Sequence, residues 1–128
     1  MIRRLVGLIG LSLLASQALA ADPVEIGIGY LGQAGVKSKL SLAEQPAEND
    51  GVAGARLAIE DNNTTGRFLN QRFTLEEVRL KDGDDVGKSA TALAARNGFI
   101  IADLPADALL KAADALRGSK TVLLNAGS

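Results

Sequence analysis

The sequence has 128 residues, with 14 basic and 15 acidic side chains and a formal net charge of −1. A nearly neutral chain without a strongly basic stretch argues against nucleic acid or an anionic membrane surface as its main partner. Histidine, cysteine and tryptophan are absent, which excludes a Ser-His-Asp triad, a Cys-His dyad, a zinc site of the usual ligands and a disulfide framework. We therefore expect no catalytic or metal-binding residues, no cofactor and no enzymatic activity.

Residues 1–20 have the pattern of a secretory signal peptide. Arg3 and Arg4 form a short positive region, an uncharged apolar run follows at 5–14, and Ala18–Ala20 offers small residues to a signal peptidase. The apolar run has about ten residues, whereas roughly 20 are needed to span a bilayer. We expect cleavage at the end of this segment, and a periplasmic mature chain, residues 21–128, that is not inserted in the membrane.

The mature chain begins with a predicted strand and a predicted helix. Apolar residues alternate with Glu25 and glycines at 24–30, which predicts a strand. A helix is expected at 51–62, with Asp50 as its N-cap. Gly66 is the expected residue of left-handed conformation at its end.

A second strand is predicted at 73–80. Its apolar residues change phase halfway, which predicts a β-bulge at Glu76-Glu77. Asp84 or Asp85 then caps a second helix, which Asn97-Gly98 closes.

The last third of the chain predicts a strand, a helix and a strand. The apolar run at 99–102 is typical of a strand that is covered on both faces. Pro105 suits the first turn of a third helix, and Gly118 ends it. Leu109, Ala113 and Leu116 are the expected buried stripe of this helix, and a fourth strand is expected at 121–124.

Strands that alternate with helices predict the α/β class, with a parallel sheet and helices on both faces. Ligands of such sheets bind at the carboxyl ends of the strands, where the strand order reverses. If the second strand lies outside the first, this point falls between the first and third strands. The loops at 31–35, 103–107 and 125–128 would then line one crevice.

Two glycine-containing motifs resemble nucleotide-binding loops. Gly27–Gly32 matches G-x-G-x-x-G, but its first two glycines lie within the predicted strand, so we interpret them as sites of close helix packing. Gly83–Ser89 lacks one residue of the P-loop spacing, and its acids suit a helix N-terminus better than a phosphate. These mismatches argue against an oxidoreductase on a nucleotide-binding fold.

Five short stretches follow one another in a characteristic order. They are Val24–Tyr30, Gly54-Ala55 with Ala58-Ile59 and Asn62, Leu80–Asp82, Gly98–Ala102, and Val122–Gly127. In this order they resemble the type I periplasmic substrate-binding proteins of ABC importers, in the branched-chain amino acid-binding class. Residues 51–59 with 62–66 look most like the branch associated with quinone (PQQ)-dependent alcohol oxidation. The resemblance covers nearly all of 23–128.

The resemblance implies the first part of the N-terminal lobe of a two-lobed fold that closes over a small ligand. The chain would then be an N-terminal fragment, a truncated gene product or a stand-alone remnant. On this interpretation Val122–Leu124 forms an unpaired apolar edge, and the mature product is expected to associate or to melt readily.

The resemblance also implies a set of ligand-binding residues at the strand ends: Tyr30, Leu31, Leu104, Pro105, Ala106, Gly127 and Ser128. Amino acid-binding members of the family have a serine at the position of Ala106 and a Gly-Ala-Thr-like turn at Gly127-Ser128. Because the hydroxyl is missing here, we expect a less polar ligand than leucine, such as a small alcohol-derived or aromatic compound.

The expected function is that of the solute-binding component of an ABC importer. Such a protein captures a small organic ligand in the periplasm and delivers it to a permease in the inner membrane. The alternative is a sensory ligand-binding domain that signals to a membrane partner.

Overall fold

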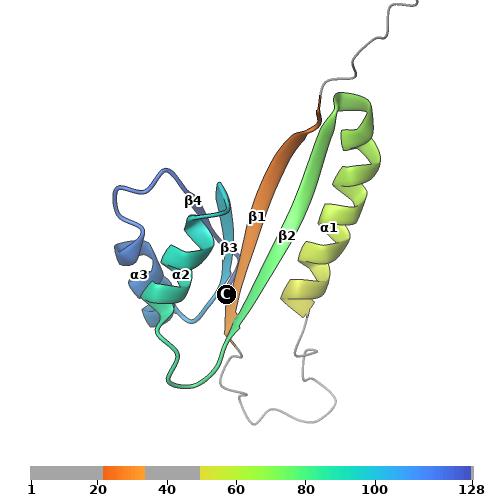
Figure 1. Ribbon diagram of the computed structural model, residues 1–128. Helices are drawn as coiled ribbons and strands as arrows, with labels where there is room; N and C mark the ends of the chain where they lie inside the picture. Colours follow the sequence, from red (N-terminus) through yellow and green to blue (C-terminus); the bar gives the residue numbers. More distant parts are fainter. Residues whose placement is uncertain (1–21, 34–49, 128) are drawn as a thin grey trace, which may run out of the picture.

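The computed structural model describes residues 22–33 and 50–127. In these residues it is an α/β fold in which a parallel sheet is flanked by helices (Figure 1). In chain order the elements are β1 (Val24–Gln33), α1 (Asp50–Gly66), the 3-10 helix η1 (Arg67–Leu69), β2 (Gln71–Leu80), α2 (Val86–Ala94), β3 (Phe99–Asp103), α3 (Ala106–Ala115) and β4 (Val122–Asn125). The predicted class and alternation of elements are confirmed. The predicted signal peptide lies outside the described residues.

The strand order in the sheet is β2-β1-β3-β4, and every neighbouring pair is parallel. β1 pairs with β2 along its whole length, from Val24 opposite Gln71 to Gln33 opposite Leu80. Only the carboxyl half of β1 pairs with β3, beginning at Ile28. β2 lies outside β1, so the condition set in the sequence analysis is met: the order reverses between β1 and β3, and the carboxyl ends of these two strands meet at one edge of the sheet.

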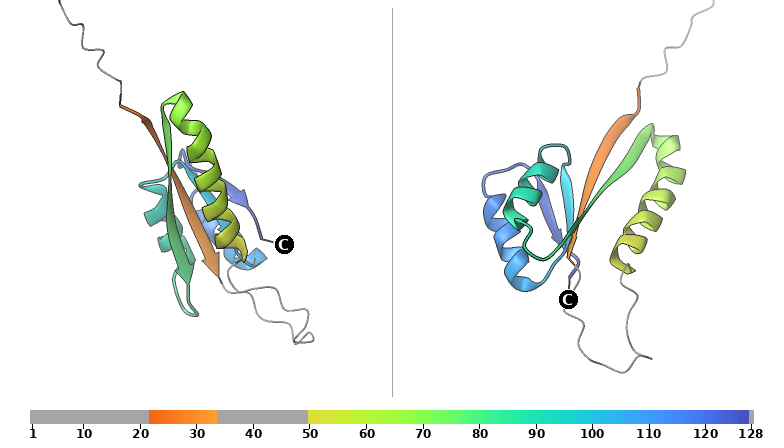
Figure 2. Two further views of the ribbon diagram at one scale, coloured as in Figure 1. Left: turned by 90° about the vertical axis from the view of Figure 1, so that its right-hand side faces the viewer. Right: turned by 60° about the horizontal axis from the view of Figure 1, so that its bottom comes forward.

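Helices cover both faces of the sheet, as predicted, but to different extents (Figure 2). α1 lies on one face over β1 and β2, and α2 and α3 lie on the other. The core between the sheet, α2 and α3 is the larger of the two, and its buried side chains are Leu31, Leu80, Ala90, Leu93, Ile100, Ala102, Leu104, Ala108, Ala112 and Leu116. The core under α1 consists of Tyr30, Val52 and Ala55.

The predicted β-bulge at Glu76-Glu77 is wrong, because the β1–β2 register continues through both residues without an insertion. The change of apolar phase has another cause. Leu75 packs in the core under α1, whereas Val78 and Leu80 pack in the core under α2 and α3. Each half of β2 thus buries a different face, since α1 covers one and the other two helices cover the second.

The glycines of the G-x-G-x-x-G motif lie inside β1, as interpreted from the sequence. A Cβ at Gly27 would lie 2.8 Å from Asn97 Oδ1 and 3.1 Å from the carbonyl oxygen of Arg96. A Cβ at Gly29 would lie 3.3 Å from Leu93 Cδ2. Both glycines therefore let the end of α2 approach the sheet closely.

The end of α1 differs from the prediction. The helix continues to Gly66, whose φ of −56° is right-handed, and η1 follows it directly. Asn70, with φ 54°, is the residue in the left-handed conformation, and the chain turns there into β2. Asp50 is the first residue of α1 rather than the cap before it, so its carboxylate lies in the first turn, where it suits the helix dipole.

Two further expectations about burial are wrong in part. Ala113 is exposed, and α3 instead buries Ala108 and Ala112, with Leu116 just beyond its end. Gly118, at φ 78°, follows as the predicted stop. β3 is fully covered on one face only, where Ile100 is fully buried. On the face of α1, Ile101 is partly buried against the core under α1, but Phe99 is 42% exposed.

Candidate ligand site at the carboxyl edge of the sheet

The candidate site lies at the edge where β1, β3 and β4 end, as the strand order requires. In open parallel sheets the crevice at such a reversal is the usual ligand position, since the loops of the two central strands diverge to opposite faces. Three groups of described residues meet here: the end of β1, the β3–α3 connection and the first turn of α1.

Tyr30 and Asp103 join the ends of β1 and β3. The Tyr30 hydroxyl donates a hydrogen bond of 2.6 Å to Asp103 Oδ2, and Tyr30 is only 2% exposed. Gly51 closes this cluster, because a Cβ there would overlap Asp103 Oδ2 and lie 2.6 Å from Tyr30 Oη. Burial, followed by the hydrogen bond to Asp103, holds the pKa of the Tyr30 phenol well above its ordinary value. The phenol is thus a donor at neutral pH.

The loops after β3 and β4 are in direct backbone contact. The amide N–H groups of Ala126 and Gly127 both donate to the carbonyl oxygen of Ala102, at 2.9 and 3.3 Å. A Cβ at Gly127 would lie 2.7 Å from the carbonyl oxygen of Leu104. Only glycine fits this close approach without a shift of the neighbouring backbone. The packing of the two loops therefore requires glycine at position 127, whether or not a ligand binds here.

The structure brings most of the predicted site residues to this edge but orients them differently. Leu31 and Leu104 point into the larger core, where they are 0% and 5% exposed. Pro105 and Ala106 are exposed at the start of α3. Ser128 lies outside the described residues. The surface that a ligand would meet therefore comes from the exposed start of α3 and from the partly exposed Asp103 and Gly127, while Tyr30 is buried behind Asp103.

The start of α3 offers backbone donors but no side-chain donor. Pro105 precedes the helix with φ −58° and ψ 154°, and no side chain caps this end. Pro105 has no N–H group of its own. Asp107 lies in the first turn, where its carboxylate already faces the helix dipole. An anionic ligand would compete with this acid.

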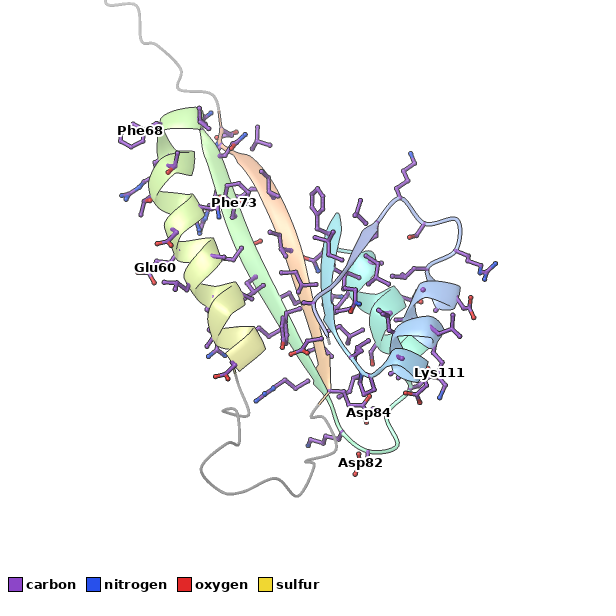
Figure 3. All side chains as sticks on the ribbon, turned by 180° about the vertical axis from the view of Figure 1, so that it is seen from behind. Glu60, Phe68, Phe73, Asp82, Asp84 and Lys111 are labelled. Atoms are coloured by element: carbon purple, nitrogen blue, oxygen red, sulfur yellow. The ribbon has the colours of Figure 1, made fainter. Side chains whose placement is uncertain are left out.

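The β2–α2 connection carries the P-loop-like motif, and its acids serve local structure. Asp85 is the N-cap of α2, as predicted, and its Oδ1 accepts from the amide of Lys88 at 2.9 Å. Asp84 Oδ2 accepts from the amide of Lys81 at 2.8 Å. Figure 3 shows Asp82 and Asp84 on this loop, beyond the end of β2. Among the described residues, no three acidic side chains are arranged to hold a metal ion.

A hollow of about 660 Å³ lies at the opposite, amino edge of the sheet. Its lining residues are Pro23, Glu60, Asn63, Thr64, Arg67, Asn70, Gln71 and Arg72. This edge carries the start of β1 and β2, where a parallel α/β sheet does not usually bind ligands. We therefore place the candidate site at the carboxyl edge, because the strand order reverses there.

The sequence places Asp103 in a loop expected to line the crevice, but it does not single out Asp103 as the partner of Tyr30, and it does not identify Gly51 as a member of the site. A signal for the Tyr30–Asp103 contact exists, because Tyr30 ends the predicted first strand and Asp103 directly follows the predicted third strand. Gly51 carries no such signal. Its proximity depends on where the first turn of α1 lies relative to the sheet, which the sequence does not state.

Comparison of the chain with protein-family models, curated proteins and solved structures finds no match. Within residues 22–33 and 50–127, none of the helices combines the length and the apolar character that a membrane crossing requires.

Proposed function

We propose that this chain is part of the solute-binding component of an ABC importer, and that it captures a small organic ligand in the periplasm for delivery to a permease in the inner membrane. The observation that carries the proposal is the reversal of strand order between β1 and β3, with the Tyr30–Asp103 pair at that point. The pattern of a signal peptide at residues 1–20 supports the periplasmic location. The resemblance to type I periplasmic binding proteins supports the role in transport.

The chemistry of this edge favours a neutral ligand over an amino acid. Ala106 has no hydroxyl, Pro105 has no N–H group, and Asp107 already occupies the first turn of α3. A carboxylate would therefore find few donors and a like charge nearby. A small alcohol or a neutral aromatic compound needs fewer donors than a carboxylate does.

Ligand titration of the exported chain tests this proposal. We would follow backbone amide resonances by NMR while adding leucine, isoleucine or valine in one series, and small alcohols or neutral aromatic compounds in another. We expect the second series to shift the resonances of Tyr30, Asp103 and Gly127. Micromolar binding of the branched-chain amino acids, with alcohols and neutral aromatic compounds inert, would contradict the ligand class. Shifts confined to the amino-edge hollow would contradict the site.

A matched pair of variants examines the missing hydroxyl. Ala106→Ser restores it at the site, whereas Ala113→Ser adds one at an exposed position of the same helix. Because a hydrogen bond to a charged group contributes about 1.5–3 kcal/mol, the first variant should bind leucine about tenfold or more tightly than wild type. The second should leave binding unchanged. Equal effects from both variants would remove Ala106 from the site.

Export and transport are tested separately. In a Gram-negative host the periplasmic fraction should contain a chain that begins at Ala21-Asp22, and a cytoplasmic chain that retains Arg3 and Arg4 would contradict export. Deleting the gene in the bacterium that carries it should reduce uptake of the bound ligand. Unchanged uptake with an altered transcriptional response to that ligand would favour the sensory alternative.

A further inference from the structure

In the part of the chain that the structure describes, no helix covers Phe99 of β3 or the strand β4 on the face of the sheet that carries α1. The register places Phe99 beside Ile28 and beside Val122, and it places Leu124 beside Ile101. Paired residues of neighbouring strands point to the same face of a sheet, so all five side chains lie on the side of α1. Phe99, Val122 and Leu124 are 42%, 46% and 49% exposed. A contiguous apolar strip is therefore open to solvent.

The width of this strip matches one helix. Parallel sheets are usually covered on both faces, and α2 and α3 lie side by side on the opposite face, whereas α1 lies over β1 and β2 and its core reaches β3 only at Ile101 (Figure 2). Each strand adds about 4.8 Å, and a helix with its side chains is about 10 Å wide. We call this strip the helix seat, formed by the exposed Phe99, Val122 and Leu124.

α1 has a second apolar side, which its own sheet does not use. Val52 and Ala55 face the sheet and are buried. Exposed on the outer side of the same turns are Ala53, Gly54, Leu57 and Ala58. Leu57 is 60% exposed, and a Cβ at Gly54 would meet no atom within 4 Å. Small residues beside one leucine make a helix surface that can approach another layer closely.

We propose that the helix seat is filled by α1 of a second copy of this chain. A two-fold axis parallel to the strands places the outer side of each α1 on the helix seat of the other copy. The two α1 helices then lie side by side in one layer between the two sheets. The proposal is independent of the proposed solute-binding function.

Charge complementarity supports this arrangement. α1 runs antiparallel to the strands, because Gly51 lies beside Asp103 at the carboxyl edge and Gly66 lies beside the start of β2. With the proposed axis, the last turns of α1 lie over the amino edge of the second copy, where Lys120 precedes β4. Asp61 projects from the outer side of these turns. Neither Asp61 nor Lys120 forms an ion pair within the described residues, so the two charges can pair between copies.

Sedimentation equilibrium of the exported chain tests the proposal against a matched control. Wild type should form a dimer, and Leu57→Glu or Leu124→Glu should weaken its association by about tenfold or more. Leu110→Glu is the control, since Leu110 is 61% exposed on α3, on the other face of the sheet, and should not change association. Circular dichroism verifies folding of each variant. A monomeric wild type, or equal effects at residues 57 and 110, would overturn the proposal.

Disulfide trapping distinguishes face-to-face pairing from pairing through the edge of β4. The chain has no cysteine, so introduced thiols report on chosen contacts. The double variant Leu57→Cys/Leu124→Cys should give a covalent dimer under mild oxidation, and each single variant should remain largely monomeric in denaturing gels. Rapid cross-linking of the single variant Leu124→Cys would indicate edge-to-edge pairing and would overturn the proposed arrangement. Cross-linking of the single variant Leu57→Cys would indicate helix-to-helix contact and would likewise overturn it.

Discussion

On the face of α2 and α3, ten buried apolar side chains form one core, whereas Tyr30, Val52 and Ala55 are the buried apolar residues on the face of α1. Both cores pack against the same sheet, so the difference in their size comes from the number of helices that cover each face. Apolar burial contributes roughly in proportion to area. The two faces should therefore respond differently to the same kind of substitution.

Polar contacts compensate in part for the small core under α1. Asn63 on α1 pairs with the backbone of Phe73 at the edge of β2, its Oδ1 accepting from the amide at 2.8 Å and its Nδ2 donating to the carbonyl at 2.9 Å. These bonds satisfy two backbone groups of an edge strand. Arg56 on α1 binds Glu77 through two hydrogen bonds of 2.6 Å. α1 is thus held by polar contacts as well as by burial.

The largest difference between the faces is expected in the cores. Leu93 lies on α2 and is fully buried, so Leu93→Ala should lower the free energy of unfolding by about 2–5 kcal/mol. Val52→Ala, in the core under α1, removes less apolar area and should cost about 1–2 kcal/mol. Urea unfolding of the exported chain measures both values. An equal or larger loss at Val52 would contradict the comparison.

Tyr30→Phe tests the polar contact between β1 and β3. The substitution keeps the buried ring but leaves the partly buried Asp103 carboxylate without its phenolic donor. A hydrogen bond to a charged group contributes about 1.5–3 kcal/mol, and we expect a loss of this size in urea unfolding. Asp114→Asn is the control. Asp114 lies on α3 and forms an exposed ion pair with Arg117, so this substitution should have little effect on the free energy of unfolding. If Tyr30→Phe left the free energy of unfolding unchanged, the contact would not stabilise the fold.

The same contact predicts a dependence on alkaline pH. The folded pKa of Tyr30 is raised above the unfolded value of about 10. Its contribution to stability is therefore complete below pH 10 and is lost as the pH rises from there toward the folded pKa. Urea midpoints at pH 9 and above pH 10 should fall more steeply for wild type than for Tyr30→Phe. Since Tyr30 is the only tyrosine, absorbance at the phenolate band reports its ionisation directly.

The smallest effect on stability is expected for Glu76 and Glu77, two adjacent carboxylates whose hydrogen-bond partners lie on opposite faces of the sheet. Hydrogen bonds from Arg96 and Asn97 lower the pKa of Glu76, and a hydrogen bond from Arg56 lowers that of Glu77. Their contributions are present above the ordinary carboxyl pKa and are lost as the pH falls through the lowered folded values.

Glu76→Gln should be the more destabilising of the two substitutions at pH 7, because Glu76 also accepts from the buried Asn97 at 2.9 Å. Urea midpoints at pH 7 and pH 3 measure the difference, which should shrink in acid as the wild-type carboxylates become protonated. A larger effect of Glu77→Gln would indicate that the contact with α1 is the more important of the two.

Most of the fold could be predicted from the sequence because its strands and helices follow local patterns. Alternation at 24–30 and the cap at Asp85 depend on near neighbours along the chain, and both are confirmed. The bulge at Glu76-Glu77 and the buried Ala113 are wrong, because each depends on which helix lies over that residue. Distant segments decide this, so local periodicity does not contain it.

The candidate site follows the same division. The alternation of elements predicts a parallel sheet, but it leaves open whether β2 lies outside β1, which decides where the strand order reverses. Tyr30 and the loop that begins at Asp103 were expected at the site, but the hydrogen bond between Tyr30 and Asp103 and the close approach of Gly51 were not. Leu31 and Leu104 were expected to line the crevice, and the structure places their side chains in the core. Residue position along a strand predicts the edge, while pleating and helix cover decide the direction of each side chain.

The sequence by itself determined the α/β class, the order of the elements, a cap at Asp84 or Asp85 and the stop at Gly118, because hydrophobic period, turn residues and capping act over a few residues. Only the tertiary structure decided that α1 covers half of one face, that each half of β2 buries an opposite side, and that Phe99 stays exposed. The physical reason is that apolar burial is non-directional. The apolar residues of a strand indicate that the strand needs burial, but the packing of helices from distant parts of the chain decides which of its side chains are buried.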